Sequence, residues 1–436
     1  MAILVVIFIF FVFLFIGFVS MKNSNSINGY VLANRSQDGF SVGLSLSATI
    51  MGASSTIGMA ALVYKIGLPG IWWLLSGVFG LIILHLFLAQ RANVLGVMTL
   101  PEAMGKFYGE YARIFSAVLI VVAWSGIVAA QFIAAGKVLS TVSNIDYKIL
   151  VFLSGVFTVI YTLIGGQYSV FKTDKLQFFI LFFGIVIVAI FLLLNYKLPP
   201  LKNDMLSFPI NAHFGIKKLL LFILVVGIPY AAGPDMYSRI FAAKNPKAAR
   251  EGVLLTILAV VIFALMIAVI GIYAHSFNTS GERLLTDMAN NILPPAVSYI
   301  FIAAILSAIV SSADTCLLSA SAITSLDILK HTSVKSIKIS VGVIGMIAIL
   351  IALYYGSIIK TLLISYGIYT GSVAVPLILG FFKDKIEIEN KYALLAIIIS
   401  AVVALILSID KNEYSGLISI MVSLSILFVG HFRKDK

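Results

Sequence analysis

The chain has 436 residues, of which 61% are hydrophobic and only 11% are charged. Soluble domains carry about 25% charged residues, so this composition excludes a large soluble domain and indicates a protein that crosses a membrane many times. The formal net charge of +12 does not point to nucleic acid, because the basic residues alternate between loops and form no single basic run. The expected partner is therefore the lipid bilayer.

Thirteen apolar segments are expected to form transmembrane helices. Most are near the ~20 residues that cross a bilayer, and none shows the alternation of a β-barrel strand. Most of the 30 basic residues then fall in the loops after odd-numbered segments and in the C-terminal tail. This bias predicts a multi-pass protein of the cytoplasmic membrane with its N-terminus outside and its C-terminus in the cytoplasm. The segments are 3–20, 41–64, 70–90, 113–140, 148–165, 173–196, 216–236, 252–274, 294–326, 337–355, 360–382, 391–409 and 414–431.

Two of these segments contain residues that interrupt a helix. Gly52 and Gly58 lie in segment 41–64, and two glycines and two prolines lie in residues 227–234. Glycine frees the backbone, and proline removes a hydrogen-bond donor and clashes with the preceding turn. Breaks at matching positions predict two inverted repeats, with ordinary kinks as the alternative. The expected organisation is an N-terminal helix and cytoplasmic loop (1–40), a first repeat (41–196), an external loop (197–215), a second repeat (216–382) and two C-terminal helices with a basic tail (383–436).

The ninth apolar segment continues into residues 304–330 and carries hydroxyl side chains and Asp314 into the membrane. Polar groups at this depth must face protein or a polar cavity, so this helix face suits a small cation. The alternatives are hydroxyls that join helices or bond to their own backbone, and a paired structural carboxylate at Asp314. The residues that share one face by i, i+3, i+4, i+7 spacing are Ala308, Ser311, Ser312 and Thr315.

Several segments resemble the sodium/solute symporter family, which includes proline and pantothenate symporters and sodium/glucose transporters. They are Ser26–Ser36, Tyr161–Gln177, Gly233–Gly252 and the helix at 304–330, and they follow the family's order. The resemblance implies an all-α, leucine-transporter-type fold of two five-helix inverted repeats with two broken helices. It also implies sodium-coupled symport of a small organic solute by alternating access. The Asp-x-x-x-Arg pattern of Asp235 and Arg239 is expected in a cytoplasmic segment.

The resemblance places the co-transported sodium ion between the first broken helix and the helix at 304–330. The ligands carried over position by position are the carbonyls of Ala53, Thr56 and Ala308 and the hydroxyls of Ser311 and Ser312. Such hard oxygen ligands suit sodium. Asp174 corresponds to a family acid that joins a second sodium site or stabilises the first, although it equally fits a cap at the start of segment 173–196. Three roles are open for Asp314. It adds charge to the cation site, builds a second site with Asp174 or binds a proton.

The candidate solute ligands lie on the same helices, with helix packing as the alternative for each. They are Ser54, Ser55, Gln131 and Tyr230. No cluster of charges marks a strongly charged solute, which favours a small amino acid or carboxylate over a sugar. The tryptophans, Trp72, Trp73 and Trp124, are expected to be interfacial anchors.

Two other function classes fit less well. An intramembrane enzyme is disfavoured, because the five histidines are scattered and no metal or nucleophile motif is present. A transport-like sensor lacks an appended signalling domain. The main alternative is a proton-coupled symporter of the same fold that uses Asp314.

Overall fold

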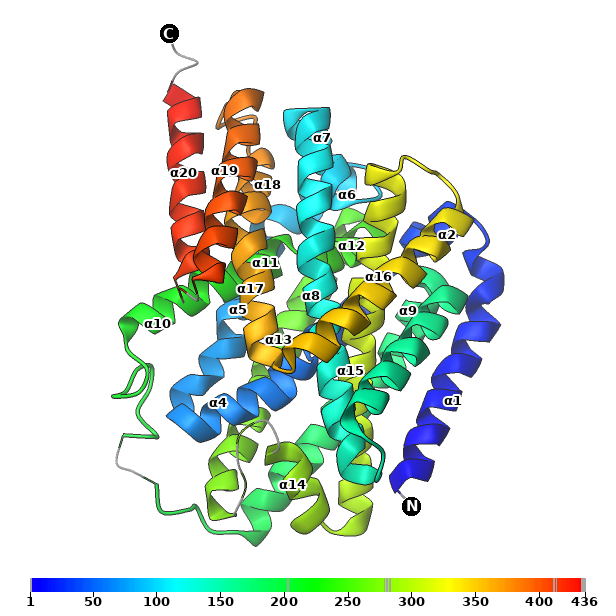
Figure 1. Cartoon of the computed structure of the whole chain (residues 1–436), viewed down its shortest axis with the longest axis vertical. Helices are drawn as coiled ribbons and strands as arrows, with labels where there is room; N and C mark the ends of the chain where they lie inside the picture. Colours follow the sequence, from blue (N-terminus) through cyan, green and yellow to red (C-terminus); the bar gives the residue numbers. More distant parts are fainter. Residues whose placement is uncertain are drawn as a thin grey trace.

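The computed structural model describes residues 2–201, 204–277, 279, 281, 284–410, 412 and 414–432, and nearly all of them are helical. Figure 1 shows the helices packed into one bundle, with α1 beginning at one end and α20 ending at the other. The helices are α1 (Ala2–Ser20), α2 (Ile27–Leu32), α3 (Gly39–Ile50), α4 (Met59–Ile66), α5 (Trp72–Ile83), α6 (Ala89–Val94), α7 (Leu100–Tyr108), α8 (Glu110–Val142), α9 (Tyr147–Asn195), α10 (Ile216–Leu221), α11 (Gly227–Ala232), α12 (Pro234–Ala242), α13 (Pro246–Tyr273), α14 (Leu284–Asn291), α15 (Pro295–Ile323), α16 (Val334–Tyr355), α17 (Ile358–Tyr369), α18 (Val375–Gly380), α19 (Asn390–Ile409) and α20 (Ser415–Phe432).

The described residues contain 11 helices long and apolar enough to cross a membrane, or up to 12 when the bent pair formed by α3 and the following helix is included. The expected number of thirteen is not confirmed. Part of the difference lies in α9, which runs for 49 residues where two segments, 148–165 and 173–196, were expected. At about 1.5 Å per residue, α9 is more than twice as long as a ~30 Å hydrocarbon core.

The helix α9 is divided at Gly166, whose backbone is left-handed with φ 58°. A side chain there would also strike the Tyr30 ring, 2.6 Å from the position of a Cβ atom. The N-terminal segment covers the exposed backbone of this break: Tyr30 donates to the Thr162 carbonyl at 3.1 Å and Ser24 donates to the Gly165 carbonyl at 2.7 Å. Residues 24–30 thus stabilise an interruption in a helix far along the chain.

Both predicted helix breaks are confirmed. The first begins where α3 ends at Ile50; residues 51–53 then lead into a π-helical turn, Ser54–Gly58, and the helix axis changes direction by 59°. The second lies at Gly233, which is extended between α11 and α12 with ψ 138°. Pro234 opens α12, where its missing N–H removes no helical hydrogen bond.

The helix α15 lies at the centre of the bundle. All of its residues from Phe301 to Ile323 are buried, including the hydroxyl-bearing ones. It packs against α3, α8, α9 and α16. Because protein surrounds α15 on every side, its polar groups meet other side chains and not lipid.

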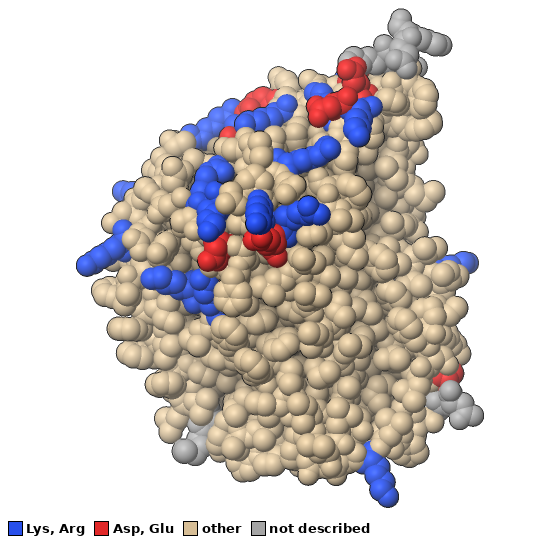
Figure 2. All heavy atoms as spheres, turned by 180° about the vertical axis from the view of Figure 1, so that it is seen from behind, with Lys and Arg blue, Asp and Glu red and all other residues tan. Residues whose placement is uncertain are grey.

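The outer surface separates apolar and basic regions. Figure 2 shows the Lys and Arg side chains gathered toward the end at which α20 finishes, with few at the other end and an almost uncharged surface between them. Large apolar side chains such as Phe8, Phe11 and Leu350 are exposed on the outer helices. This pattern fits helices that face lipid. Of the predicted basic tail, residues 433–436 lie outside the described residues.

Candidate cation and solute site

A network of buried polar side chains joins α3, α9, α12 and α15. Its central member is the Asp174 carboxylate of α9, which is fully buried. Its Oδ1 accepts a 2.6 Å hydrogen bond from the Ser311 hydroxyl. Its Oδ2 accepts hydrogen bonds from the Ser45 hydroxyl and from Arg239, the latter at 3.0 Å. One carboxylate therefore holds together three helices that are distant in sequence.

Arg239 supplies the positive charge of this network and has no exposed surface. Besides its ion pair with Asp174, it donates to Ser45 at 3.0 Å, to Ser238 at 3.0 Å and to Thr315. The prediction that the Asp-x-x-x-Arg pattern is a cytoplasmic segment is therefore wrong. The pattern begins directly after the break at Gly233, and the short α12 carries the guanidinium into the interior.

Asp174 does not cap a helix. The helix α9 runs without interruption from the break at Gly166 to Asn195, so Asp174 lies inside it. All three of its side-chain donors come from other helices. The capping alternative is thus wrong, and the acidic side chain is part of the buried network instead.

Asp314 is fully buried beside the same network. Its Oδ1 accepts a 3.3 Å hydrogen bond from Thr315, which in turn accepts one from Arg239. Its Oδ2 is buried and has no hydrogen-bond partner among the described residues. A buried carboxylate oxygen without a donor is costly, so it marks a place where a cation or a proton is favourable.

At the first break, carbonyls at the end of α3 lack backbone donors, and one of them meets α15. A helix that ends at Ile50 leaves its last carbonyls without intrahelical donors, and no backbone N–H of the described residues reaches those of residues 48–51. The Ser312 hydroxyl donates to one of them, the Thr49 carbonyl, at 2.6 Å. Close approach requires Gly52, because a Cβ atom there would lie 2.9 Å from Ser312 Cβ.

Ala53 and Thr56 lie just beyond these free carbonyls. The Ala53 carbonyl accepts a 3.3 Å hydrogen bond from the Thr56 hydroxyl, and the Thr56 carbonyl accepts one from the Met59 N–H. Both carbonyls lie within helical backbone. The Ala308 carbonyl lies within the continuous helix α15, one turn before Ser312. Of the three predicted sodium ligands on α15, Ser312 is the one whose side chain bonds to the broken helix.

Gln131 of α8 contacts the same break close to Ser312. Its Oε1 accepts a 3.1 Å hydrogen bond from the Ala53 N–H, which the irregular backbone leaves without a helical acceptor. Gln131 is 3% exposed. Its side chain therefore supplies an acceptor for a backbone N–H of the broken helix, and it also lines the adjacent cavity.

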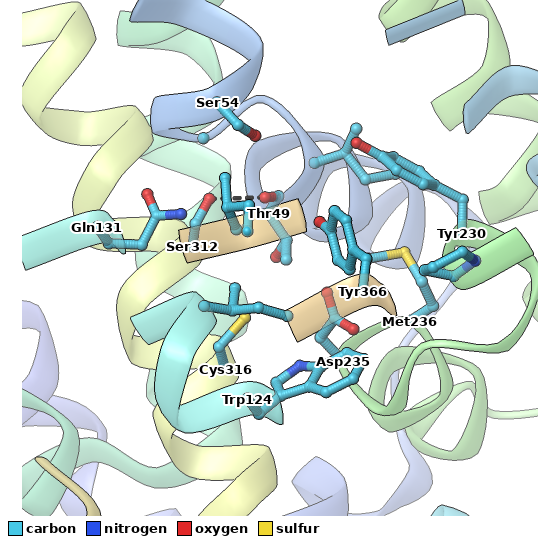
Figure 3. A pocket seen from close by; sticks show the side chains of 15 residues that line it. Thr49, Ser54, Trp124, Gln131, Tyr230, Asp235, Met236, Ser312, Cys316 and Tyr366 are labelled. Carbon is cyan, nitrogen blue, oxygen red and sulfur yellow. Dashed lines mark hydrogen bonds between the residues drawn. The ribbon is translucent and has the colours of Figure 1, made fainter. Parts of the chain in front are cut away.

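A small cavity of about 40 Å³ lies between the two broken helices and α15. Three of the four predicted solute ligands line it: Ser54, Gln131 and Tyr230 (Figure 3). Ser55 is not among the lining residues, and its hydroxyl donates to the Ile50 carbonyl. The remaining lining residues are Thr49, Ile50, Gly52, Trp124, Ile127, Pro229, Asp235, Met236, Ser312, Cys316, Leu362 and Tyr366.

The most polar lining residue not predicted from the sequence is Asp235. It was assigned to the cytoplasmic Asp-x-x-x-Arg segment at the end of segment 216–236, although its position two residues after Gly233 places it at the depth of the second break. Trp124 was also misassigned: it is 1% exposed and lines the cavity, as Figure 3 shows, so it is no interfacial anchor. Trp73 is equally buried. Proximity to a predicted break is the signal that would have identified Asp235.

A family model described as the sodium:solute symporter family matches residues 30–400. The chain belongs to this family. It is therefore a membrane transporter and not an enzyme, and sodium is its co-transported ion. The donor set agrees with this, because it offers hydroxyls, carbonyls and carboxylates, and the described residues contain no group of three or more His, Cys, Asp or Glu that could hold a metal ion.

Two curated members of the family illustrate the similarity. The osmoregulated proline transporter OpuE of Bacillus subtilis is 27% identical over 430 residues, which are 91% of this chain and 86% of that protein. The sodium/pantothenate symporter of Haemophilus influenzae is 27% identical over 336 residues, 70% of this chain and 67% of its own length.

Solved structures establish the fold. A sodium-coupled sialic acid symporter in a substrate-bound, outward-open state superposes with a TM-score of 0.82 at 18% identity, over 98% of this symporter and 97% of that chain. MhsT in complex with L-phenylalanine gives a TM-score of 0.57 at 15% identity, over 93% and 98% of the two chains. The expected leucine-transporter-type fold is confirmed. The division into repeats at 41–196 and 216–382 stays a prediction.

Proposed function

We propose that this symporter couples inward sodium movement to the uptake of a small amino acid or carboxylate by alternating access. The observation that carries the proposal is the arrangement at the end of α3. Free carbonyls of the broken helix face the hydroxyl of Ser312, next to a cavity large enough for a small chemical group. An ion held there contacts two helices that must separate for the pathway to open.

The proposed sodium ligands are the Ala308 carbonyl and the hydroxyls of Ser311 and Ser312, together with carbonyls of the broken helix. Ala53 and Thr56 remain candidates from the family resemblance. The carbonyls of residues 48–51 are favoured by the hydrogen bond between Ser312 and Thr49 and by their lack of backbone donors. Sodium prefers such oxygen donors.

Asp174 and Asp314 are proposed to add charge to the cation region. Ser311 connects the two parts of the site, because its hydroxyl bonds to Asp174 while its neighbour Ser312 bonds to the broken helix. Arg239 compensates one carboxylate of the pair. The Asp314 Oδ2, which lacks a donor among the described side chains, supports a second cation position between these acids.

Sodium binding is proposed to hold α3 against α15, and solute binding in the cavity then permits closure on one side and opening on the other. Coupling requires that sodium bind these states with different affinity. A membrane potential of about 100 mV acting on one charge supplies about 2.3 kcal/mol, which corresponds to roughly 40-fold accumulation. Ser54, Gln131 and Tyr230 are the proposed polar contacts to the solute.

The proposed orientation places the end of the molecule with many basic residues in the cytoplasm. It is supported by the distribution of Lys and Arg in Figure 2 and by the preference of basic residues for cytoplasmic loops. The N-terminus is then outside and the C-terminus inside the cytoplasmic membrane.

The deciding experiment is solute uptake into proteoliposomes under imposed ion gradients. Sodium coupling predicts accumulation with an inward sodium gradient and none with a proton gradient alone. The second candidate, proton coupling through Asp314, is favoured by the missing partner of its Oδ2. It predicts the opposite dependence, with accumulation lost in Asp314→Asn. Uptake that dissipates any gradient without accumulation would contradict both.

A further inference from the structure

The cavity between the broken helices has an acidic side chain on its wall. Asp235 lies in the first turn of α12, and it is partly exposed because it lines the cavity. Figure 3 shows its carboxylate between the Trp124 indole and the Tyr366 ring, directed toward the cavity. No Lys, Arg or His is among the residues that line this space.

No Lys, Arg or His of the described residues forms an ion pair with Asp235. Arg239, one turn further along α12, directs its hydrogen bonds to Asp174, Ser45, Ser238 and Thr315. Within the described part of the chain, no salt bridge involves Asp235. The N-terminus of α12 stabilises negative charge at this position but neutralises none of it.

Aromatic groups surround the carboxylate. Trp124, Tyr230 and Tyr366 all line the cavity. The indole N–H of Trp124 lies close to Asp235 but outside hydrogen-bonding geometry, and it has no partner among the described residues. Aromatic faces together with a carboxylate attract cations, and ammonium groups are recognised in this way.

An ionised Asp235 needs a cation that the protein does not supply. Three acids, Asp174, Asp235 and Asp314, lie around one base, Arg239, and unpaired buried charges are strongly unfavourable. The proposed sodium position accounts for the excess charge at Asp174 and Asp314. The second position, at Asp235, is inside the solute cavity, so its occupant belongs to the solute.

We infer that this symporter carries a solute with a protonated amine or a small quaternary ammonium group, and that Asp235 binds this group. The inference rests on the proposed function, because it takes the cavity as the solute site. It narrows the solute from an amino acid or carboxylate to a compound with a cationic nitrogen. A cavity of about 40 Å³ accommodates only a small head group in this arrangement.

The test measures thermal stabilisation of the purified full chain in sodium by pairs of compounds that differ in the cationic nitrogen. The pairs are L-alanine with propionate and choline with 3,3-dimethyl-1-butanol, and methylammonium and L-proline are added as further ammonium probes. We expect stabilisation by at least one ammonium compound and none by its uncharged or deaminated counterpart. In Asp235→Asn the concentration for half-maximal stabilisation should rise at least about tenfold.

Glu251→Gln is the matched control, because it removes an exposed carboxylate outside the site. Asp235→Glu keeps the negative charge and should retain ammonium selectivity. This variant shows whether a loss of binding in Asp235→Asn reflects the missing charge or a misfolded protein. Equal stabilisation by both members of each pair, no stabilisation by any ammonium compound, or binding to Asp235→Asn within about twofold of the wild type would overturn the inference. Stabilisation by sodium without solute is recorded separately, so a loss of sodium coupling is distinguished from a loss of ammonium selectivity.

Discussion

The hydroxyl of Ser312 donates a 2.6 Å hydrogen bond to the backbone carbonyl of Thr49, from the centre of α15 to the last turn of α3. This contact joins a continuous helix to a broken one. The two helices that it joins are those between which the sodium ion is proposed to bind.

Ser312→Ala should weaken sodium binding. The variant removes one proposed ligand and the hydrogen bond to Thr49, so the sodium concentration for half-maximal thermal stabilisation should rise at least about tenfold, or about 1.4 kcal/mol. Sodium is exchanged for potassium at constant ionic strength. The control is Ser307→Ala on the same helix, whose hydroxyl has no hydrogen-bond partner among the described residues. Equal sodium responses in the two variants would remove Ser312 from the site.

Gly52→Ala should disrupt the same site by steric contact. The new methyl group would lie 2.9 Å from Ser312 Cβ, which forces α3 and α15 apart. We expect the sodium-dependent stabilisation to be lost. Gly58→Ala is the control, because a Cβ atom there meets Ile359 at an ordinary 3.5 Å. A normal sodium response in Gly52→Ala would show that the site tolerates separation of these helices.

Asp174 and Arg239 should behave as a coupled pair. Removing either partner leaves a buried charge, so Asp174→Asn and Arg239→Gln should each destabilise the protein by about 3–5 kcal/mol. The double variant should lose less free energy of unfolding than the sum of the two single losses, as measured by denaturant unfolding in detergent. The exposed pair Lys247 and Glu251 provides the comparison, with about 0–1 kcal/mol expected. Additive losses at the buried pair would contradict this account.

Gly166→Ala should be strongly destabilising. The residue has φ 58°, and a Cβ atom would lie 2.6 Å from the Tyr30 ring. Left-handed backbone costs a non-glycine residue about 1–2 kcal/mol before the clash is counted. Gly342→Ala in α16 meets nothing within 4 Å and should be neutral or stabilising. Thermal unfolding of both variants checks this expectation, and similar melting temperatures would contradict it.

The variant Asp314→Asn distinguishes sodium coupling from proton coupling. Under sodium coupling the variant should still require a sodium gradient, but its half-saturating sodium concentration should rise because a nearby negative charge is lost. Proteoliposome uptake measures both quantities. Proton-driven uptake by the wild type that disappears in Asp314→Asn would favour the proton-coupled alternative.

Much of the fold was predictable because its signals are local. Apolar runs predicted the helices, glycine and proline predicted both breaks, and the hydroxyl spacing predicted the polar face of α15. Three of the four solute candidates line the cavity, since residues near a break share its depth. The family resemblance supplied the leucine-transporter-type arrangement, which local patterns do not determine.

The errors came from contacts that are distant in sequence. Asp235 and Arg239 were placed in a cytoplasmic segment because the residues after the break are short of apolar side chains. Only the packing of α12 against α3 and α15 and the ion pair with Asp174 show that the guanidinium is buried. The Asp174 carboxylate resembled a cap because its partners lie on three other helices. Trp124 followed the usual preference of tryptophan for interfaces, but a cavity beside α8 accommodates its ring.

The hydrogen bond from the Ala53 N–H to Gln131 has a consequence for the resting state of the symporter. Any movement of the first broken helix away from α8 leaves a buried N–H without an acceptor, at a cost of about 1–3 kcal/mol. By itself that cost disfavours the separation by a factor of roughly 5 to 150. The amide side chain of Gln131 therefore opposes movement of the first broken helix away from α8.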